Sequence, residues 1–437
     1  MNIINILFKP IMIYYFNMFK YLFYYSKLFL WLSFLWIHDK YYPINIDIYE
    51  CLLQTILLCG CIPIKFIQWC IPYLYLTSDK KYYEIIKLFE KTYENCNFHS
   101  MDYTKKIYYR DFNKNFNDEF CNIKEIASGS IGQVYKITNK HTHKNYALKV
   151  IHPGIYYELY LINIILKSIL FIFPIHKIIC FNIYDFYQEF KKQSDFINEA
   201  NNLLYFYHKY IDNHKIRIPE LYKISNHLLI MEYIDGDKIN MNNYLLISLF
   251  IMNNLNTLQL NHGDLHPGNF RIKKNQLVIY DFGYCWLNNI PNDLFNCFSN
   301  MVHIYDDDFI NLYSESEREE LFLSLIQKLN IDVKYFHNMI HDFKILNIRN
   351  PKEYVLFLIN IHKKYNLKMN SNIINLFLTI IITNKYSQNS YNLDMYNYCK
   401  TYDIFKDYQL ILKNNIQKKK TNIRTNYNEF EHLKKYI

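Results

Sequence analysis

The sequence has 437 residues, which is enough for two or three domains and a sizeable core. Of its net charge of +9, residues 1–38 carry three lysines and no acid, and residues 406–437 carry eight basic and three acidic residues, so the middle of the chain is left with only +1. Enzymes that act on nucleic acids carry a basic stripe along their working face, so this nearly neutral body argues against nucleic acid as a main partner.

Small residues are scarce in this chain, and their positions are therefore informative. Seven of the eight glycines lie between positions 129 and 283, and the three alanines are Ala127, Ala147 and Ala200. Small residues persist where nothing larger fits, because of close backbone approach or a positive φ. Their clustering indicates a site between positions 127 and 283. The ten cysteines include no C-x-x-C pair, so we expect reduced thiols rather than a zinc site.

We interpret residues 1–50 as a targeting or membrane-associated segment. Its apolar run at 28–37, LFLWLSFLWI, is too short to span a bilayer comfortably. The first 38 residues lack Arg and are poor in Ser, unlike a mitochondrial transit peptide, so a signal anchor and a helix lying on a membrane both remain open. The basic tail, residues 406–437, suits contact with anionic lipid, although a solvated terminus is the simpler explanation.

Residues 51–120 are expected to form a helical extension. The apolar stretch at 52–76 contains Lys65, Gln68 and two prolines, which make a membrane-spanning helix costly. A helix packed on a protein surface is therefore the expectation for this stretch. Residues 79–120 are mixed and charged, and we expect helices with a linker there.

A small lobe is expected over residues 121–236. Strands are predicted at 121–127, 133–138 and 146–150, with the glycine-rich turn ASGSIGQV after the first. Aligned to the pattern G-x-G-x-x-G-x-V, this turn has an alanine in place of the first glycine. Backbone amides of such a turn approach phosphate only where side chains are small. The nucleotide-binding residues predicted here are Ala127, Ser128, Gly129, Ser130, Gly132, Val134, Ala147 and Lys149.

Lys149 is placed to bridge the α- and β-phosphates of ATP. A long helical region at 156–210 follows, and within it Glu199, next to Ala200, is the expected ion-pair partner that holds Lys149. An ordinary surface glutamate is the alternative for Glu199. Two further strands are predicted at 217–225 and 227–234, and at the end of the second, Glu232 and Tyr233 are expected to contact adenine through the backbone.

The most informative stretch is NHGDLHPGNF at 261–270. His262, Asp264 and Asn269 form H-x-D-x-x-x-x-N, and D-F-G follows at 281–283 after a predicted strand at 277–280. Asp264 suits the catalytic carboxylate that takes a proton from the attacking oxygen, and Asn269 and Asp281 suit the ligands of a divalent metal. An Asx-rich turn between two strands is the alternative. Such a turn rarely repeats both spacings, so we favour phosphoryl transfer.

A large lobe is expected over residues 237–405. Residues 238–260 are predicted to be helical, and beyond Trp286 amphipathic helical stretches occur at 318–329 and 372–383. Acidic runs at 306–308 and 317–320 could bind cations, but the start of a solvated helix is the preferred interpretation.

With these motifs, the chain resembles the UbiB family of atypical kinases, also called the aarF-domain-containing or ADCK family, over roughly residues 55–390. The resemblance lies in GSIGQVY, ALKVIHPGI, DFINEA and HGDLHPGN with D-F-G. Ordinary protein kinases do not carry the phrase KVIHPG. The resemblance implies an α+β, protein-kinase-like, two-lobed fold, with a small antiparallel-sheet lobe, a large mainly helical lobe and an N-terminal helical extension.

The same resemblance implies a function. It predicts binding of ATP with Mg²⁺ or Mn²⁺, slow ATPase activity and a role in ubiquinone or other isoprenoid lipid metabolism at an organelle membrane. The expected partners are lipid or isoprenoid-quinone precursors and an anionic membrane surface, and the expected location is the mitochondrion, with a plastid or another organelle possible.

Two departures from the family pattern concern expected regulatory residues. The K-x-G-Q motif, which in relatives inserts into the active site and restrains protein kinase activity, is present as Lys65 to Gln68 with Ile67 in place of glycine. A close approach of that helix is therefore in question. The family's E-x-D is present as Gln193 to Asp195, so a lysine facing Gln193 would gain a hydrogen bond in place of an ion pair, leaving Asp195 as the nearby charge.

Two other functions remain open. A small-molecule kinase related to aminoglycoside phosphotransferases shares HGDLHPGN but does not predict the KVIHPG phrase or the segment around Lys65. A non-catalytic scaffold on membranes would tolerate loss of motif residues, whereas the five expected catalytic and metal-binding positions are all intact: Lys149, Glu199, Asp264, Asn269 and Asp281.

Overall fold

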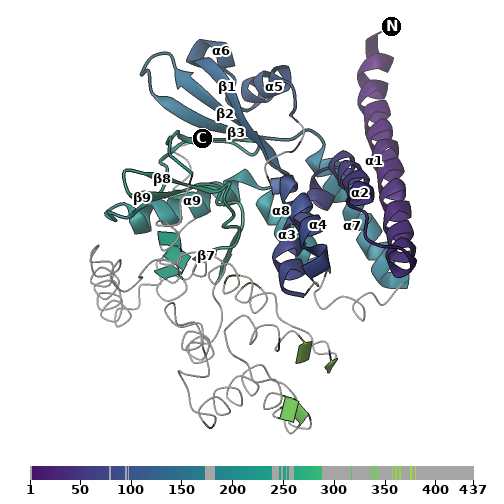
Figure 1. Ribbon diagram of the computed structural model, residues 1–437. Helices are drawn as coiled ribbons and strands as arrows, with labels where there is room; N and C mark the ends of the chain where they lie inside the picture. The colour runs from purple at the N-terminus through teal and green to yellow at the C-terminus, as the bar shows by residue number, and fades with distance from the viewer. Residues whose placement is uncertain are drawn as a thin grey trace.

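The computed structural model describes residues 2–77, 80–93, 96, 98–172, 183–238 and 260–287, together with single residues between 246 and 254 and between 316 and 379. A helical extension lies beside a five-stranded antiparallel sheet, and two further short sheets are formed mainly by later parts of the chain (Figure 1). The predicted α+β, two-lobed architecture is confirmed for this part of the chain. The predicted boundaries between its parts stay predictions.

The extension is built from helices that share one apolar core. Leu52, Leu53 and Ile56 pack with Ile64, Ile85 and Ile86 in that core. The stretch at 52–76 therefore packs on protein, as predicted. Its elements are α1 (Asn2–Tyr41), α2 (Ile46–Cys59), α3 (Cys61–Thr77), η1 (Lys80–Tyr82), α4 (Tyr83–Phe89) and η2 (Glu90–Tyr93).

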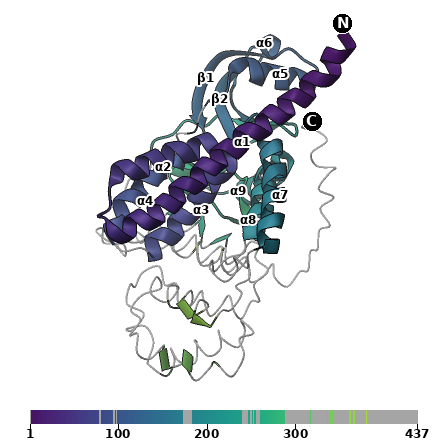
Figure 2. The ribbon, with the colours of Figure 1, turned by 90° about the vertical axis from the view of Figure 1, so that its right-hand side faces the viewer.

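The first helix, α1, crosses the outer side of the extension and reaches α7 (Ile155–Ile172) (Figure 2). The 40 residues of α1 form one continuous helix, whereas the sequence left the form of this segment open. No helix among the described residues has both the length and the apolar character needed to cross a membrane.

The small lobe is a five-stranded sheet in the order β1-β2-β3-β6-β5, in which all neighbours are antiparallel. Its last two strands are β6 (Leu228–Glu232) and β5 (Leu221–Ile224). The helices α5 and α6 cover it, with Tyr108 and Phe116 packed against Tyr135 and Leu148. The three strands predicted at 121–127, 133–138 and 146–150 are confirmed. These elements are α5 (Met101–Phe112), α6 (Phe116–Glu119), β1 (Phe120–Ser128), β2 (Gly132–Asn139) and β3 (Asn145–Ile151).

The predicted helical region after Lys149 consists of α7 (Ile155–Ile172), α8 (Ile183–Gln193) and α9 (Phe196–Tyr210), and its residues 173–182 lie outside the described part. Asp195 is the N-cap of α9, and its carboxylate accepts hydrogen bonds from the amides of Ile197 and Asn198. Ending α8 and starting α9 at this cap turns the chain so that Glu199 faces the sheet.

The prediction of one continuous strand at 217–225 is wrong. The stretch is divided into β4 (Ile216–Arg217) and β5 (Leu221–Ile224), which belong to different sheets. Pro219 lies between them, and because proline has no N–H it cannot continue a ladder of hydrogen bonds. The second predicted strand is present as β6 (Leu228–Glu232).

Two short sheets carry the motifs of the large lobe. The strands β8 (Phe270–Lys273) and β9 (Gln276–Ile279) form an antiparallel hairpin, with β4 parallel to β9. The strands β7 (Leu260–His262) and β10 (Cys285–Leu287) pair with each other. Most of the helices predicted at 238–260, 318–329 and 372–383, and the whole tail at 406–437, lie outside the described residues.

Candidate active site

Lys149 lies in the middle of β3, opposite Val134 of β2 and Leu229 of β6. Its Nζ lies 2.7 Å from one carboxylate oxygen of Glu199 and 2.9 Å from the other, so the predicted ion pair is present. The same ammonium lies 3.1 Å from Oδ1 of Asp281. Residues from β3, α9 and the D-F-G segment therefore meet at the ammonium group of Lys149.

The charges of these three groups depend on one another. Burial favours neutral Lys149, but the carboxylates of Asp281 and Glu199 outweigh it and raise the pKa of the lysine. Burial raises the pKa of Glu199 to about 7 against the pull of Lys149, with repulsion from Asp281 adding to the rise. Burial also acts on Asp281, but Lys149 and Lys65 hold its pKa well below the usual range. Asp281 therefore keeps its negative charge.

The backbone at Asp281 has the left-handed φ of 52°, which Asp adopts more readily than most residues. The amide of Gly283 donates to Oδ1 of Asp281 over 3.1 Å and fixes that side chain. A Cβ at Gly283 would lie 3.1 Å from this same oxygen and 3.4 Å from Oε2 of Glu199. The glycine of D-F-G thus leaves room for two carboxylates beside Lys149.

Asp264 and Asn269 lie on one loop between β7 and β8. The amide of Asp264 donates to Nδ1 of the buried His262. The side-chain amide of Asn269 donates to the backbone carbonyl of Asp264 over 2.8 Å, which leaves the carboxamide oxygen as an acceptor. The backbone carbonyl of Asn269 accepts from the amide of Tyr280, so Asn269 is tied to the residue before Asp281.

The oxygen atoms at this place fit a hard divalent cation. Asn269 offers a carboxamide oxygen and Asp281 a carboxylate, and oxygen donors are what Mg²⁺ prefers. Within the described ranges, no cluster of three or more His, Cys, Asp or Glu is arranged to hold a metal ion. A metal bound here would need further oxygens from water or from the phosphates of a nucleotide.

Lys65 of α3 reaches into the same site. Its Nζ lies 2.5 Å from Oδ2 of Asp264, although the two residues are 199 positions apart. Burial favours the neutral acid, but Lys65 outweighs it and lowers the pKa of Asp264. Ile67, whose bulk put this approach in question, packs against the apolar core of the extension instead of separating the helix from the loop.

Gln68, one turn from Lys65, connects α3 to the glycine-rich turn. Its Nε2 donates to the carbonyl of Thr92 over 2.6 Å, and its Oε1 accepts from Oγ of Ser130 over 3.4 Å. The other two residues predicted to regulate the site are placed differently: Gln193 is buried at the end of α8, and the Asp195 side chain caps α9. The lysine that enters the site, Lys65, therefore pairs with Asp264.

The glycine-rich turn is closed by the hydrogen bond from the amide of Gly129 to the carbonyl of Gly132. A Cβ at Gly132 would lie 2.7 Å from the carbonyl oxygen of Val150, so this position is packed. At Gly129 a Cβ would meet nothing closer than 3.7 Å, which leaves room for a ligand to approach. The remaining residues predicted to bind nucleotide lie beside this turn on β1, β2 and β3: Ala127, Ser128, Val134 and Ala147.

A histidine that sequence reasoning did not single out supports this turn. Nε2 of His152 lies 2.9 Å from the carbonyl oxygen of Gly129 and 3.3 Å from Oγ of Ser128. Its Nδ1 lies 2.9 Å from Nδ1 of His99, and burial lowers the pKa of both rings. In the sequence, the phrase HPG at 152–154 indicates the family but assigns no role to this histidine. The stacking of Tyr93 on His266 had no sequence signal.

In the segment predicted to contact adenine, the backbone amides of Glu232 and Tyr233 already have partners, and the contact itself stays a prediction. The amide of Glu232 donates to the carbonyl of Glu220, and the amide of Tyr233 donates to the carbonyl of Asn145. These two amides are satisfied because the segment is still tied to the sheet. The side chain of Glu232 pairs with Arg217. The next backbone donor along the segment is the amide of Ile234.

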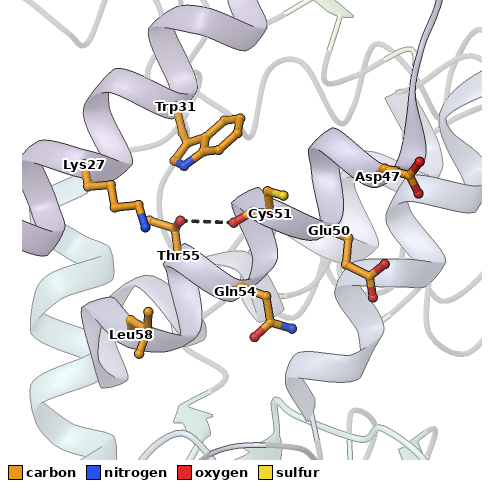
Figure 3. A pocket seen from close by; sticks show the side chains of 8 residues that line it. All are labelled: Lys27, Trp31, Asp47, Glu50, Cys51, Gln54, Thr55 and Leu58. Carbon is orange, nitrogen blue, oxygen red and sulfur yellow. Dashed lines mark hydrogen bonds between the residues drawn. The ribbon is translucent and has the colours of Figure 1, made fainter.

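A separate groove of about 450 Å³ lies between α1 and α2 (Figure 3). Lys27 and Trp31 of α1 face Cys51 and Thr55 of α2 across it. None of the motif residues lines this groove, so it is distinct from the cluster around Lys149.

Comparison with known proteins places the chain among its relatives. Residues 91–314 match the ABC1 atypical kinase-like domain family. The chain is 32% identical over 180 residues to Protein ACTIVITY OF BC1 COMPLEX KINASE 1, chloroplastic, of Arabidopsis thaliana. The aligned region covers 36% of this chain and 26% of that protein. The chain is 31% identical over 171 residues to an uncharacterized aarF domain-containing protein kinase, chloroplastic, of the same plant, covering 36% and 24%.

The chain thus spans about a quarter of the length of these curated relatives. A solved structure of a Mycobacterium tuberculosis protein in complex with erythromycin matches with a TM-score of 0.47 and 16% identity, over 67% of this chain and 80% of that one. Since the family match extends over more than half of its residues, this chain belongs to the ABC1 atypical kinase-like family, the UbiB or ADCK family that its motifs resemble.

Proposed function

We propose that this protein binds Mg²⁺-ATP between the glycine-rich turn and the D-F-G segment and transfers the γ-phosphoryl group to an acceptor or to water. The observation that carries the proposal is the meeting of Lys149 with Glu199 and Asp281 beside the loop that holds Asp264 and Asn269. Phosphoryl transfer needs little covalent chemistry from a protein, so positioning and charge decide the rate.

Each residue has a role in this proposal. Lys149, held by Glu199, contacts the α- and β-phosphates, and Asn269 and Asp281 hold the metal. The metal, when bound, neutralises the charge that develops on the phosphates. Asp264 accepts the proton of the attacking oxygen. In the structure Lys65 forms an ion pair with the carboxylate of Asp264. This lysine must move away before Asp264 can accept a proton.

The physiological role belongs to the proposal as well. The chloroplastic relatives support an organelle as the place of work. The family resemblance supports a role there in the metabolism of ubiquinone or another isoprenoid lipid. Contact with an anionic membrane is supported by a stripe of exposed apolar side chains on α1, flanked by lysines. The stripe comprises Phe19, Phe23, Leu30, Phe34, Ile37 and Tyr41.

Nucleotide binding is tested by thermal unfolding with and without Mg²⁺-ATP. We expect Mg²⁺-ATP to raise the melting temperature of the wild type and to have no effect on Asp281→Ala, because this variant lacks a metal ligand. Asp102→Ala, at an exposed position of α5, is the matched control and should keep the rise. An equal rise in Asp281→Ala would place the nucleotide elsewhere.

A scaffold without catalysis is the second candidate, and one observation favours it. The ion pair between Lys65 and Asp264 engages the carboxylate that the reaction needs. A protein held permanently in this state would bind nucleotide without turning it over. Measuring ATP turnover in the wild type separates the two candidates.

A further inference from the structure

Gly60 is the glycine that lies outside the cluster between residues 129 and 283. It joins α2 to α3 and has a φ of 111°, a backbone conformation that side chains disfavour. A Cβ at this position would lie 2.6 Å from Oε2 of Glu158. The junction therefore needs glycine because a buried carboxylate lies against it.

That carboxylate anchors the first turn of α3. Oε2 of Glu158 accepts a hydrogen bond from the amide of Cys61, and Oε1 accepts one from the amide of Ile62, both over 2.8 Å. The side chain of Glu158 is fully buried. The first amides of a helix have no partner within the helix, and a carboxylate there is favoured by the helix dipole. A residue of α7 thus holds the start of a helix that lies about 100 positions earlier in the chain.

The N-terminal helix is joined to the same anchor. The hydroxyl of Tyr25 in α1 donates to Oε1 of Glu158 over 3.0 Å. One turn earlier, Tyr21 packs over Gly154, where a Cβ would lie 2.8 Å from the tyrosine hydroxyl. Three helices, α1, α3 and α7, therefore meet at Glu158.

Lys65 follows Ile62 by less than one helical turn, so whatever fixes the first turn of α3 also fixes where the Lys65 ammonium lies. We propose that Glu158 is a positioning residue that acts through Lys65: it holds the start of α3 so that Lys65 stays on the Asp264 carboxylate, and Tyr25 links α1 to this anchor. The consequence for turnover rests on the proposed ATP site, whereas the position of Lys65 does not.

The substitution Glu158→Gln tests the anchor with little change in volume. A carboxamide has one acceptor oxygen, and its NH₂ group would face the second backbone amide. Above pH 7, where Glu158 is a carboxylate, losing one of its hydrogen bonds changes an equilibrium by about tenfold or more. We therefore expect Lys65 to leave Asp264 more often in this variant.

The first measurement is acylation of lysines by a water-soluble reagent, followed by mass spectrometry. We expect the labelling rate of Lys65 to rise about tenfold in Glu158→Gln. The control is Glu189→Gln, which breaks a surface pair with Lys192 and should leave the rate unchanged. The buried Lys149 serves as an internal reference. An unchanged Lys65 rate, or an equal rise at Lys149, overturns the proposal.

If Glu158→Gln gives no folded protein, Tyr25→Phe decides the question, because it removes one donor and leaves both backbone bonds in place. A smaller rise at Lys65 is then expected. Tyr41→Phe, at an exposed position of the same helix, is its control. No rise at Lys65 in Tyr25→Phe counts against the anchor.

The second measurement is ATP turnover in a double-mutant cycle of Glu158→Gln and Lys65→Ala. We expect each single variant to raise turnover and the double variant to match Lys65→Ala, since the anchor acts only through Lys65. An equal loss in both backgrounds means that Glu158 supports the fold alone, and the proposal fails. If no variant turns over ATP while Lys65 labelling rises as expected, the positioning of Lys65 by Glu158 is supported and the proposed function fails.

Discussion

At the scale of single residues, the site depends on one lysine that faces two carboxylates. Asp281 keeps its charge, and burial raises the pKa of Glu199 to about 7 against the attraction of Lys149. The role of Glu199 is then geometric, because its two oxygens hold the ammonium at the centre of β3.

The substitution Glu199→Gln tests that role. We expect the protein to fold, because Asp281 still balances Lys149, and we expect affinity for Mg²⁺-ATP to fall about tenfold, the loss of one charge-assisted hydrogen bond. Isothermal titration measures the affinity, with Glu189→Gln as the surface control. An unchanged affinity would mean that Glu199 does not position Lys149 for the nucleotide.

A second residue-scale prediction concerns pH. Burial raises the pKa of Glu158 from 4.5 to about 7. The folded protein therefore binds this proton more tightly than the unfolded chain, so the stability contributed by the neutral acid is present below pH 4.5 and is lost as the pH rises to about 7. Relative to Glu158→Gln, which cannot titrate, the melting temperature of the wild type should fall between pH 5 and pH 8. Parallel curves would contradict the raised pKa.

At the scale of secondary-structure elements, much of the small lobe was predictable. The strands around Lys149 follow from alternating apolar residues and from turn residues that punctuate them, which are local signals. The division of the strand at Pro219 could have been predicted from the missing N–H, but the change of sheet could not. The engaged amides of Glu232 and Tyr233 depend on Glu220 and Asn145, which only the folded sheet brings near.

The family resemblance placed the K-x-G-Q segment at the active site, but the particular partners of α3 were beyond reach of the sequence. Lys65 meets Asp264 across 199 residues, and Glu158 meets Ile62 across 96. Neither spacing has a period that local reasoning detects. The consequence of Ile67 was equally hidden, because only the helix packing determines which of its faces meets the glycine-rich turn.

The substitution Ile67→Gly tests how α3 is held. Restoring the glycine of the family pattern removes a side chain from the core of the extension and places glycine inside a helix, so we expect a loss of about 2 kcal/mol in the free energy of unfolding. Lys65 should remain on Asp264, and ATP turnover should not increase. Chemical denaturation and a turnover assay measure the two effects. Turnover that rises as in Lys65→Ala would show that Ile67 itself weakens the restraint.

At the scale of the whole molecule, α1 lies along the extension with its inner side facing α2 and α7 and an apolar stripe on its outer side (Figure 2). Phe23 and Leu30, in the middle of this stripe, are 66% and 67% exposed. A helix that exposes apolar side chains beside lysines is suited to the surface of an anionic bilayer. The inner side of the same helix carries Tyr25, which touches the Glu158 anchor.

Membrane contact is tested by replacing Phe23 and Leu30 with glutamate, which leaves Tyr25 in place. We expect cosedimentation with vesicles that contain an anionic phospholipid to fall, because each change removes apolar area and adds repulsion. Glutamate at the exposed Tyr109 and Tyr222, which lie outside α1, is the control for added charge. Equal binding by the Phe23 and Leu30 variant would move the contact to another part of the chain.

In the proposed reaction Asp264 acts on an acceptor while other residues hold the nucleotide, and the substitution Asp264→Asn separates these two roles. A positioned base contributes about 10²–10⁴-fold to a rate, whereas the groups that bind metal and phosphate are Lys149, Asn269 and Asp281. In parallel measurements on one preparation, we predict that Asp264→Asn binds Mg²⁺-ATP as tightly as the wild type and loses turnover by about that factor. Equal turnover by the two proteins would contradict a catalytic role for Asp264.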